Sequence, residues 1–365
     1  MMNIIIFLII LLVLVVSHEW GHFIVAKKSG IRVDEFSFGF PPKLFGVKRG
    51  ETSYNFNALP FGGYVKIFGE NPNEESLNGP DSKRSFVNKP WYTQASVLVA
   101  GVVMNFIVAW ILLSIGFMSG LPSSAGQVPE GTVLSNQALT ITSVLAGSPA
   151  EKGQLKVGDK ITLMKAGDDA TETPSTTSVQ YFIKKHGNEP ITISYLRGSE
   201  TKEVIVTPEI TKTSDTPMIG ISMDIIGNLK LPVHKALFEG LKLSWDLVVA
   251  TVQGFYHLIY DGLSGHGSLA GITGPIGIVG VVGDAASFGF IYLLSFTALI
   301  SINLAVINLI PFPALDGGRL LFLLIEKIKG SRITPKIANT ANVIGFGLLM
   351  ILMVVITYND IVKLL

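Results

Sequence analysis

The feature that most constrains this chain is a series of apolar runs, each long enough to cross a membrane. The first covers residues 3–26, and others cover about 95–121, about 288–310, and about 341–356 or beyond. A helix needs about 20 apolar residues to cross a hydrocarbon layer of roughly 30 Å. We therefore predict a polytopic α-helical membrane protein with about four transmembrane helices, whose first partner is the lipid bilayer.

The composition excludes several classes of protein. Of the 365 residues, 48% are hydrophobic and only 15% are charged, which is too apolar for an ordinary soluble enzyme. The net charge is +1, and no run of Lys and Arg is interleaved with aromatic residues, so we expect no nucleic-acid partner. The chain has no cysteine, so any metal ion must be bound by His, Asp or Glu.

The first apolar run is interrupted by polar residues that include the H-E-x-x-H sequence His18-Glu19-Trp20-Gly21-His22. On a helix, His18 and His22 lie on one face, one turn apart, and can bind one zinc ion. Glu19 can then take a proton from the water that the metal activates and pass it to the leaving amine. Ionisable groups inside a span are costly and mark a functional site. A secretory signal peptide is the alternative, but the run has neither a basic segment before it nor a small-residue cleavage site.

A catalytic zinc ion usually has three protein ligands, so a third donor should lie elsewhere on the same membrane side. Asp316 is the candidate, because it follows the third apolar run in the segment Asn308–Gly318. The two prolines of this segment end the helix, and its glycines permit close backbone approach. From the spacing alone, a helix-ending turn with a solvated Asp316 remains equally open.

The distribution of positive charge predicts which loops face the cytoplasm. Basic residues follow the first run and also lie between the third and fourth: Lys27, Lys28, Arg32, Lys43, Lys48 and Arg49, then Lys327, Lys329, Arg332 and Lys336. The positive-inside rule places both loops in the cytoplasm. The N-terminus, the stretch from about 122 to 287, and the C-terminus would then lie outside.

Residues 233–261 form a long and largely apolar segment that could be a fifth span. Glu239, Lys242 and Asp246 interrupt it, which favours an amphipathic helix lying in the outer interface. A fifth span would also reverse the next one and separate Asp316 from the two histidines. We therefore expect the interfacial helix, and after it a structural turn without a catalytic role in the Gly-Pro segment Ile272–Ile278.

Two regions between the spans have the pattern of strands. Residues 31–90 alternate short apolar and aromatic stretches with Gly and Pro, as in Ser53–Phe56 and Gly62–Lys66, which predicts short strands and hairpins. The second region is the soluble insert of about residues 128–225, which has strand-like runs at 141–144, 161–164, 191–195 and 203–207. Its length suits one small domain.

Taken together, these motifs closely resemble those of the site-2 protease family, specifically the bacterial RseP-type intramembrane zinc metalloproteases. The resemblance extends over nearly the whole chain. It is carried by His18–His22, by Gly62–Lys66, by Asn308–Gly318, and by Phe36–Phe40, Lys43–Gly46, Phe86–Pro90 and Ala100-Gly101 with Asn105.

The resemblance implies roles that the spacing does not provide. Asp316 would be the third zinc ligand, and Asn303 and Asn308 would hold the extended backbone of the substrate. Gly62, Gly63, Tyr64 and Val65 would form the edge of a membrane-associated β-hairpin sheet, onto which an unwound substrate segment adds as a strand. A self-contained hairpin that covers the cytoplasmic face is the alternative.

The outer insert is similar to PDZ domains of bacterial proteases, through Ser143–Gly153 and Leu155–Ile161. In the circularly permuted PDZ arrangement, Ile219, Gly220 and Ile221 would belong to the loop that binds a peptide carboxylate. A strand with one glycine is the plain alternative for this segment.

These assignments divide the chain into seven regions. They are 1–27 (transmembrane helix 1 with H-E-x-x-H), 28–94 (cytoplasmic β-hairpin region), 95–121 (transmembrane helix 2), 122–227 (PDZ domain with linkers), 228–286 (interfacial amphipathic helix and Gly-Pro segment), 287–326 (transmembrane helix 3 and L-D-G-G motif), and 327–365 (cytoplasmic loop and transmembrane helix 4).

The predicted function is that of an intramembrane zinc endopeptidase with one Zn²⁺ per chain. Its substrates would be single-span membrane proteins that another protease has already cut, such as anti-sigma factors or remnant signal peptides. It would lie in the bacterial inner (cytoplasmic) membrane, with the PDZ domain outside and the active site toward the cytoplasm. A catalytically inactive, membrane-anchored PDZ adaptor is the main alternative, and a metal transporter is a third.

Overall fold

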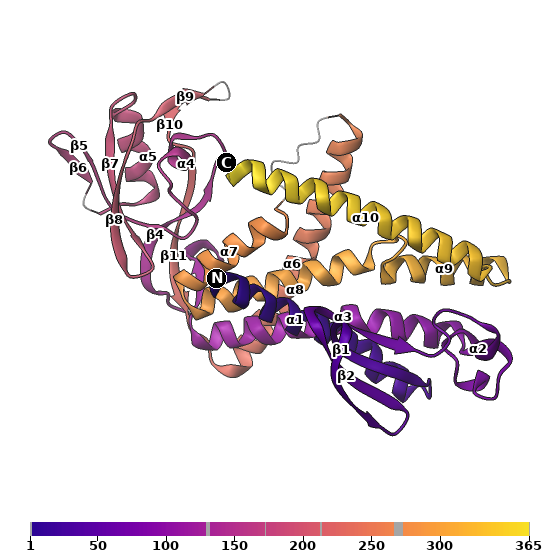
Figure 1. Ribbon diagram of the computed structural model, residues 1–365. Coiled ribbons are helices and arrows are strands. Elements are labelled where there is room, and N and C mark those ends of the chain that lie inside the picture. The colour runs from indigo at the N-terminus through magenta and orange to yellow at the C-terminus, as the bar shows by residue number, and fades with distance from the viewer. Residues whose placement is uncertain (1, 129–131, 172, 212–213, 266–272, 365) are drawn as a thin grey trace. The chain divides into compact units, whose positions relative to one another are not determined.

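The computed structural model describes residues 2–128, 132–171, 173–211, 214–265 and 273–364. The chain divides into two compact units (Figure 1). Unit 1 comprises Met1–Ser114, Leu237–Asp284 and Leu294–Leu365, and unit 2 comprises Ile115–Ala236 and Ala285–Leu293.

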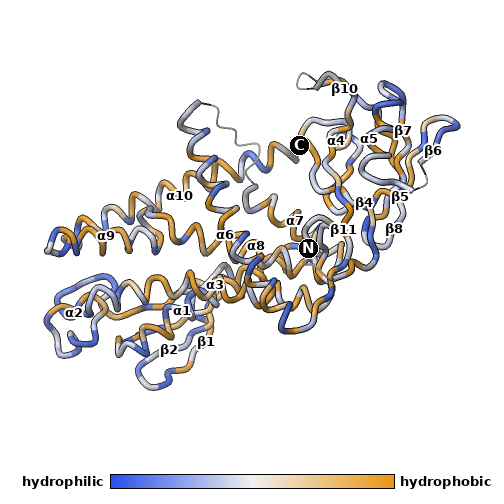
Figure 2. Tube along the Cα trace, turned by 180° about the vertical axis from the view of Figure 1, so that it is seen from behind, coloured by the Kyte–Doolittle hydropathy of each residue, from blue (hydrophilic) through white to orange (hydrophobic). Residues whose placement is uncertain are grey.

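Four helices of the described chain are long and apolar enough to cross a membrane, which confirms the predicted number. They are α1 (Met2–Lys28), α3 (Trp91–Ser119), α8 (Phe290–Leu309) and α10 (Pro335–Leu364), and Figure 2 shows them as mostly hydrophobic. The helix α3 begins earlier than the apolar run because the carbonyl of Pro90 accepts hydrogen bonds from the amides of Thr93 and Gln94. The helix α9 (Asp316–Lys329) lies between α8 and α10.

The described residues between Leu229 and α8 form two helices. The long helix α6 (Val233–Leu263) is not one of the four candidate spans, and its Leu243 and Leu247 pack against the core formed by α3 and α8. The predicted turn of the Gly-Pro segment instead begins a helix, α7 (Pro275–Phe288), because proline is well suited to the first helical position. Residue 272, also part of that predicted turn, lies outside the described residues. The buried carboxylate of Asp360 in α10 accepts hydrogen bonds from the amides of Gly274 and Gly277 at 3.1 and 2.8 Å.

The predicted hairpin region forms a small sheet from β1 (Val33–Arg49) and β2 (Thr52–Ile67). Phe36 pairs with Val65 on one side and with Tyr54 on the other. Within the described pairings, residues 33–38 are therefore central and residues 63–67 form an edge. The sheet packs on α1 and α3 through buried side chains: Ala26, Ile31, Val33, Phe36, Val65, Ile67, Phe86, Val97 and Leu98. Three short helices follow it: α2 (Glu74–Asn78), η1 (Ser82–Arg84) and η2 (Phe86–Asn88).

Unit 2 is built on a seven-stranded sheet in the order β3-β11-β4-β5-β7-β8, with β6 paired to β5. Its strands are β3 (Leu121–Ser124), β4 (Ser135–Val144), β5 (Lys160–Ala166), β6 (Asp169–Thr171), β7 (Ile191–Arg197), β8 (Glu200–Val206) and β11 (Ile221–Leu229), and β9 (Glu209–Thr211) pairs with β10 (Ser214–Met218). The four predicted strand-like runs fall within or overlap β4, β5, β7 and β8.

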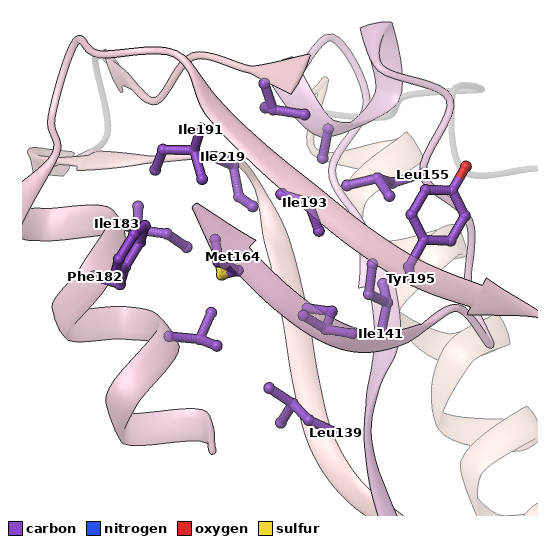
Figure 3. Close-up of a cluster of buried hydrophobic side chains, with 14 of the residues drawn as sticks. Leu139, Ile141, Leu155, Met164, Phe182, Ile183, Ile191, Ile193, Tyr195 and Ile219 are labelled. Atoms are coloured by element: carbon purple, nitrogen blue, oxygen red, sulfur yellow. The ribbon is translucent and has the colours of Figure 1, made fainter. Parts of the chain in front are cut away.

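The core of unit 2 lies between this sheet and the helix α5 (Thr176–Lys185). Figure 3 shows Ile141, Met164, Ile191 and Ile193 from the sheet facing Phe182 of this helix. The shorter helices α4 (Pro149–Lys152) and η3 (Ala125–Gln127) lie in its connections. The unit therefore has a buried core of its own.

Candidate metal centre and its surroundings

Three ligand atoms from distant parts of the sequence meet in unit 1. Nε2 of His18 lies 3.1 Å from Nε2 of His22 and 2.9 Å from Oδ2 of Asp316, and Nε2 of His22 lies 3.3 Å from that oxygen. A tetrahedral zinc ion with bonds of about 2.0–2.1 Å holds its ligand atoms roughly 3.3 Å apart. The three atoms therefore have nearly the separation that one zinc ion requires, and both histidines are buried.

The hydrogen bond at Nδ1 of His22 also favours the binding of a cation at Nε2. Nδ1 lies 2.7 Å from the backbone oxygen of Val97, and a carbonyl oxygen can only accept, so Nδ1 donates. In a neutral imidazole, Nε2 then carries a lone pair, which faces the carboxylate of Asp316. Two buried acceptors that face each other repel unless a positive charge lies between them.

Small residues bring α1 and α3 together at this centre. A Cβ atom on Gly21 would lie 2.3 Å from the backbone oxygen of Ala100. One on Gly101 would lie 2.5 Å from Nε2 of His22 and 2.7 Å from Nε2 of His18. The backbone of α3 can therefore reach both imidazoles only because these positions are glycine.

The segment between α8 and α9 directs Asp316 toward the histidines. Ala314 has a left-handed backbone with φ of 77°, which is strained for a residue with a side chain. Its amide donates to Oδ1 of Asn342 in α10 at 3.2 Å. A Cβ atom on Gly317 or Gly318 would lie 2.2–2.3 Å from backbone oxygens of the preceding loop, so the predicted close approach at these glycines is confirmed.

Glu19 and the edge of the hairpin sheet are in direct contact. The amide of Val65 donates to Oε2 of Glu19 at 3.0 Å. Because Val65 lies in the edge segment 63–67, this bond ties that edge to the H-E-x-x-H helix. The arrangement places the predicted general base beside the predicted strand-addition site.

The other predicted residues of the hairpin have internal roles. Gly62 has a φ of 134°, and a Cβ atom on Gly63 would lie 2.6 Å from the oxygen of Ser37. The hydroxyl of Tyr64 donates to Oε1 of Glu35 at 2.7 Å. Burial raises the pKa of Glu35, but hydrogen bonds from Ser37, Tyr64 and Asn55 outweigh it and leave the pKa below its ordinary value.

The two predicted substrate-binding asparagines both lie on α8. Oδ1 of Asn303 accepts a hydrogen bond from Thr251 of α6 at 3.0 Å. Asn303 also lines a cavity of about 690 Å³ bounded by α6, α7 and α8. Asn308 is half-buried, one residue before the end of the helix.

Several residues around the centre have roles that the sequence interpretation missed. The carbonyl of Val97 orients His22, and Glu70 pairs with Arg319 in the first turn of α9. Thr251 donates a hydrogen bond to Asn303. A backbone carbonyl has no signal in the sequence. The contact at Gly101, in contrast, could have been predicted from the sequence, because a lone glycine in a span marks close helix packing.

The predicted carboxylate loop of unit 2 contains a glycine with a left-handed backbone. Gly220 has a φ of 80°, and Ile219 is buried. A cavity of about 340 Å³ is bordered on one side by α5 and on the other by a segment that includes Ile219, Gly220, Ile221 and Met223. Such a groove between a strand and a helix can accept a peptide.

Comparison with known proteins places this site in a family. The model of peptidase family M50 matches residues 6–352. A zinc metalloprotease of Clostridium acetobutylicum is 36% identical over 99% of this chain and 97% of its own length. The zinc metalloprotease RasP of Shouchella clausii is 30% identical over 98% of each chain. The regulator of sigma-W protease RasP of Bacillus subtilis is 29% identical over 99% of this chain and 98% of its own.

A solved structure also matches part of the chain. The PDZ domain of an SdrC-like protein from Listeria monocytogenes is similar over 25% of this chain and 92% of its own, with a TM-score of 0.21 and 22% identity. The family match, in contrast, extends over nearly the whole sequence and includes both parts of the metal centre. The chain therefore belongs to peptidase family M50 and is an intramembrane zinc metalloprotease.

Proposed function

We propose that His18, His22 and Asp316 bind one zinc ion per chain and that Glu19 is the general base and acid of peptide hydrolysis. The observation that carries this assignment is the convergence of two imidazole nitrogens and one carboxylate oxygen at 2.9–3.3 Å. The test is whether the purified chain in lipid vesicles cuts a single-span substrate while its Glu19→Gln variant does not.

The chemistry follows from the neighbours of each group. A bound zinc ion supplies Lewis acidity, which makes a water molecule nucleophilic near neutral pH. Glu19 accepts the proton of the attacking water and returns it to the leaving nitrogen. The oxygen of Val97 holds His22 so that Nε2 faces the shared space. The buried position of the histidines excludes bulk water from the site.

The substrates we propose are single-span membrane proteins that another protease has already shortened. The B. subtilis relative is named a regulator of sigma-W protease, which supports anti-sigma factors as one class and leaves remnant signal peptides as another. Asn303 and Asn308 would bind the extended substrate backbone. Unit 2 would act as an extracytoplasmic PDZ domain, with Ile219, Gly220 and Ile221 at a peptide terminus, and the metal centre would face the cytoplasmic side of the inner membrane.

The hairpin edge would present the substrate to the metal centre. A helical peptide bond has its amide paired internally, so the substrate must unwind before attack, and an edge strand can pair with the exposed groups. Residues 63–67 form such an edge, and the amide of Val65 reaches Glu19. This contact supports Gly62, Gly63, Tyr64 and Val65 as the strand-addition segment.

Replacement of Val65 by proline should weaken cleavage without removing zinc. Proline lacks the amide that donates to Glu19, and we expect a rate about 10-fold lower, corresponding to the loss of one hydrogen bond of about 1.4 kcal/mol. The measurement is the initial cleavage rate in vesicles, with Val65→Ala as the control that keeps the amide. Equal rates for the proline and alanine variants would show that the hydrogen bond from the Val65 amide to Glu19 does not contribute to cleavage.

A further inference from the structure

Asn105 of α3 is a fully buried polar residue beside the metal centre, and none of the steps above uses it. Its Nδ2 lies 3.3 Å from Nδ1 of His18, and its buried Oδ1 has no hydrogen-bond partner among the residues that the structure describes. The backbone oxygen of Asn105 accepts a hydrogen bond from Ser301 of α8 at 2.8 Å. The residue is therefore fixed by its backbone, while its amide is held by the contact with His18.

The described orientation of this amide suits a histidine that donates from Nε2. If Nδ2 of Asn105 donates to Nδ1 of His18, that nitrogen is bare and Nε2 carries the proton. Nε2 then donates to Oδ2 of Asp316, which lies 2.9 Å away. In this pattern both ring nitrogens of His18 are hydrogen-bonded to side chains, but Nε2 has no lone pair for a metal ion.

Metal binding requires the opposite tautomer. When Nε2 of His18 is a ligand, its proton resides on Nδ1, and Nδ1 then needs an acceptor. The oxygen and nitrogen of a carboxamide have nearly the same shape, and a half-turn of the amide exchanges them. No hydrogen bond to Oδ1 opposes that half-turn.

We propose that Asn105 is a positioning residue of the metal centre, whose Oδ1 accepts the Nδ1 proton of His18 and thereby directs Nε2 toward the metal. His22 has the equivalent arrangement, with Nδ1 donating to the oxygen of Val97. The helix α3 would thus supply an acceptor to each of the two imidazoles. This inference rests on the proposed zinc site and adds the group that selects the tautomer of His18.

A positioning role for Asn105 predicts different outcomes for two substitutions whose side chains are similar in size to asparagine. Asn105→Asp keeps oxygen acceptors and loses the amide donor, so zinc affinity should stay within about threefold of the wild type or increase. Asn105→Leu has no acceptor and should weaken zinc binding about 10- to 100-fold. The measurement is the zinc dissociation constant of the full-length protein in lipid nanodiscs, obtained by competition with a chelator. A parallel titration with Co²⁺ monitors the ligand field of the site by its visible absorption.

Ser114→Ala is the matched control, because it removes a buried hydroxyl from the same helix, and this hydroxyl donates to the backbone oxygen of Trp110. It should leave zinc affinity unchanged. An aspartate variant that loses 10-fold or more, or a leucine variant with wild-type affinity, would overturn the role of Asn105. If the leucine variant does not fold, Asn105→Ala, which also lacks an acceptor, replaces it, and wild-type zinc affinity in that variant would overturn the role. A wild-type protein that binds no zinc would instead contradict the metal site itself.

Discussion

The Glu19→Gln variant is expected to lose cleavage of a single-span substrate while its zinc content stays at the wild-type level. Glutamine has the size of glutamate but cannot accept and return a proton, and a positioned general base contributes about 10²- to 10⁴-fold to a rate. Its side-chain oxygen can still accept the hydrogen bond from Val65, which lies 3.0 Å from Oε2 of Glu19. The hairpin edge should therefore remain in place.

The measurement for this variant is the rate of substrate cleavage in lipid vesicles, together with metal analysis of the same preparation. Ser17→Ala is a suitable control, because Ser17 lies on the same helix and its hydroxyl donates to the backbone oxygen of Val13. It should cleave at the wild-type rate. Cleavage by Glu19→Gln at the wild-type rate would show that another group moves the proton.

The Asp316→Ala variant is expected to lose both zinc and activity. Its carboxylate oxygen lies 2.9 Å from His18 and 3.3 Å from His22, and its removal leaves two imidazoles to bind the ion. Loss of a residue that only supports a ligand costs about 10- to 100-fold in metal affinity. Loss of the ligand itself should therefore weaken zinc binding by more than about 100-fold.

Chelator competition measures this loss directly. Asp81→Asn provides a control, because Asp81 forms an ion pair with Arg32 in the hairpin region and is not one of the three residues of the candidate centre. It should bind zinc as the wild type does. Wild-type zinc affinity in Asp316→Ala would mean that the third ligand lies elsewhere in the chain.

The sequence predicted the metal centre because its chemistry follows a local pattern. His18 and His22 are four residues apart on one helix, and helical geometry alone places them together. Asp316 could be proposed only from the need for a third ligand and from the family resemblance. The fold brings it to the histidines through the strained turn at Ala314 and the close contacts of Gly317 and Gly318.

Other features could not be predicted because they depend on tertiary contacts. The roles of Val97, Asn105 and Glu70 arise where α3, the hairpin region and α9 meet the centre. We predicted a turn at the position where α7 begins, Pro275. The sequence could not decide this, because a Gly-Pro pair can either end a loop or begin a helix. In the structure, hydrogen bonds to Asp360, far along the sequence, stabilise the helical alternative.

The proposed centre consists of two imidazoles and one carboxylate that bind a single zinc ion within the membrane helices. X-ray absorption at the zinc edge of the full-length protein in nanodiscs tests it most directly. We predict one zinc per chain with nitrogen and oxygen ligands at about 2.0–2.1 Å, and multiple scattering that corresponds to two imidazoles. A spectrum without imidazole scattering, or a protein without zinc, would contradict the claim.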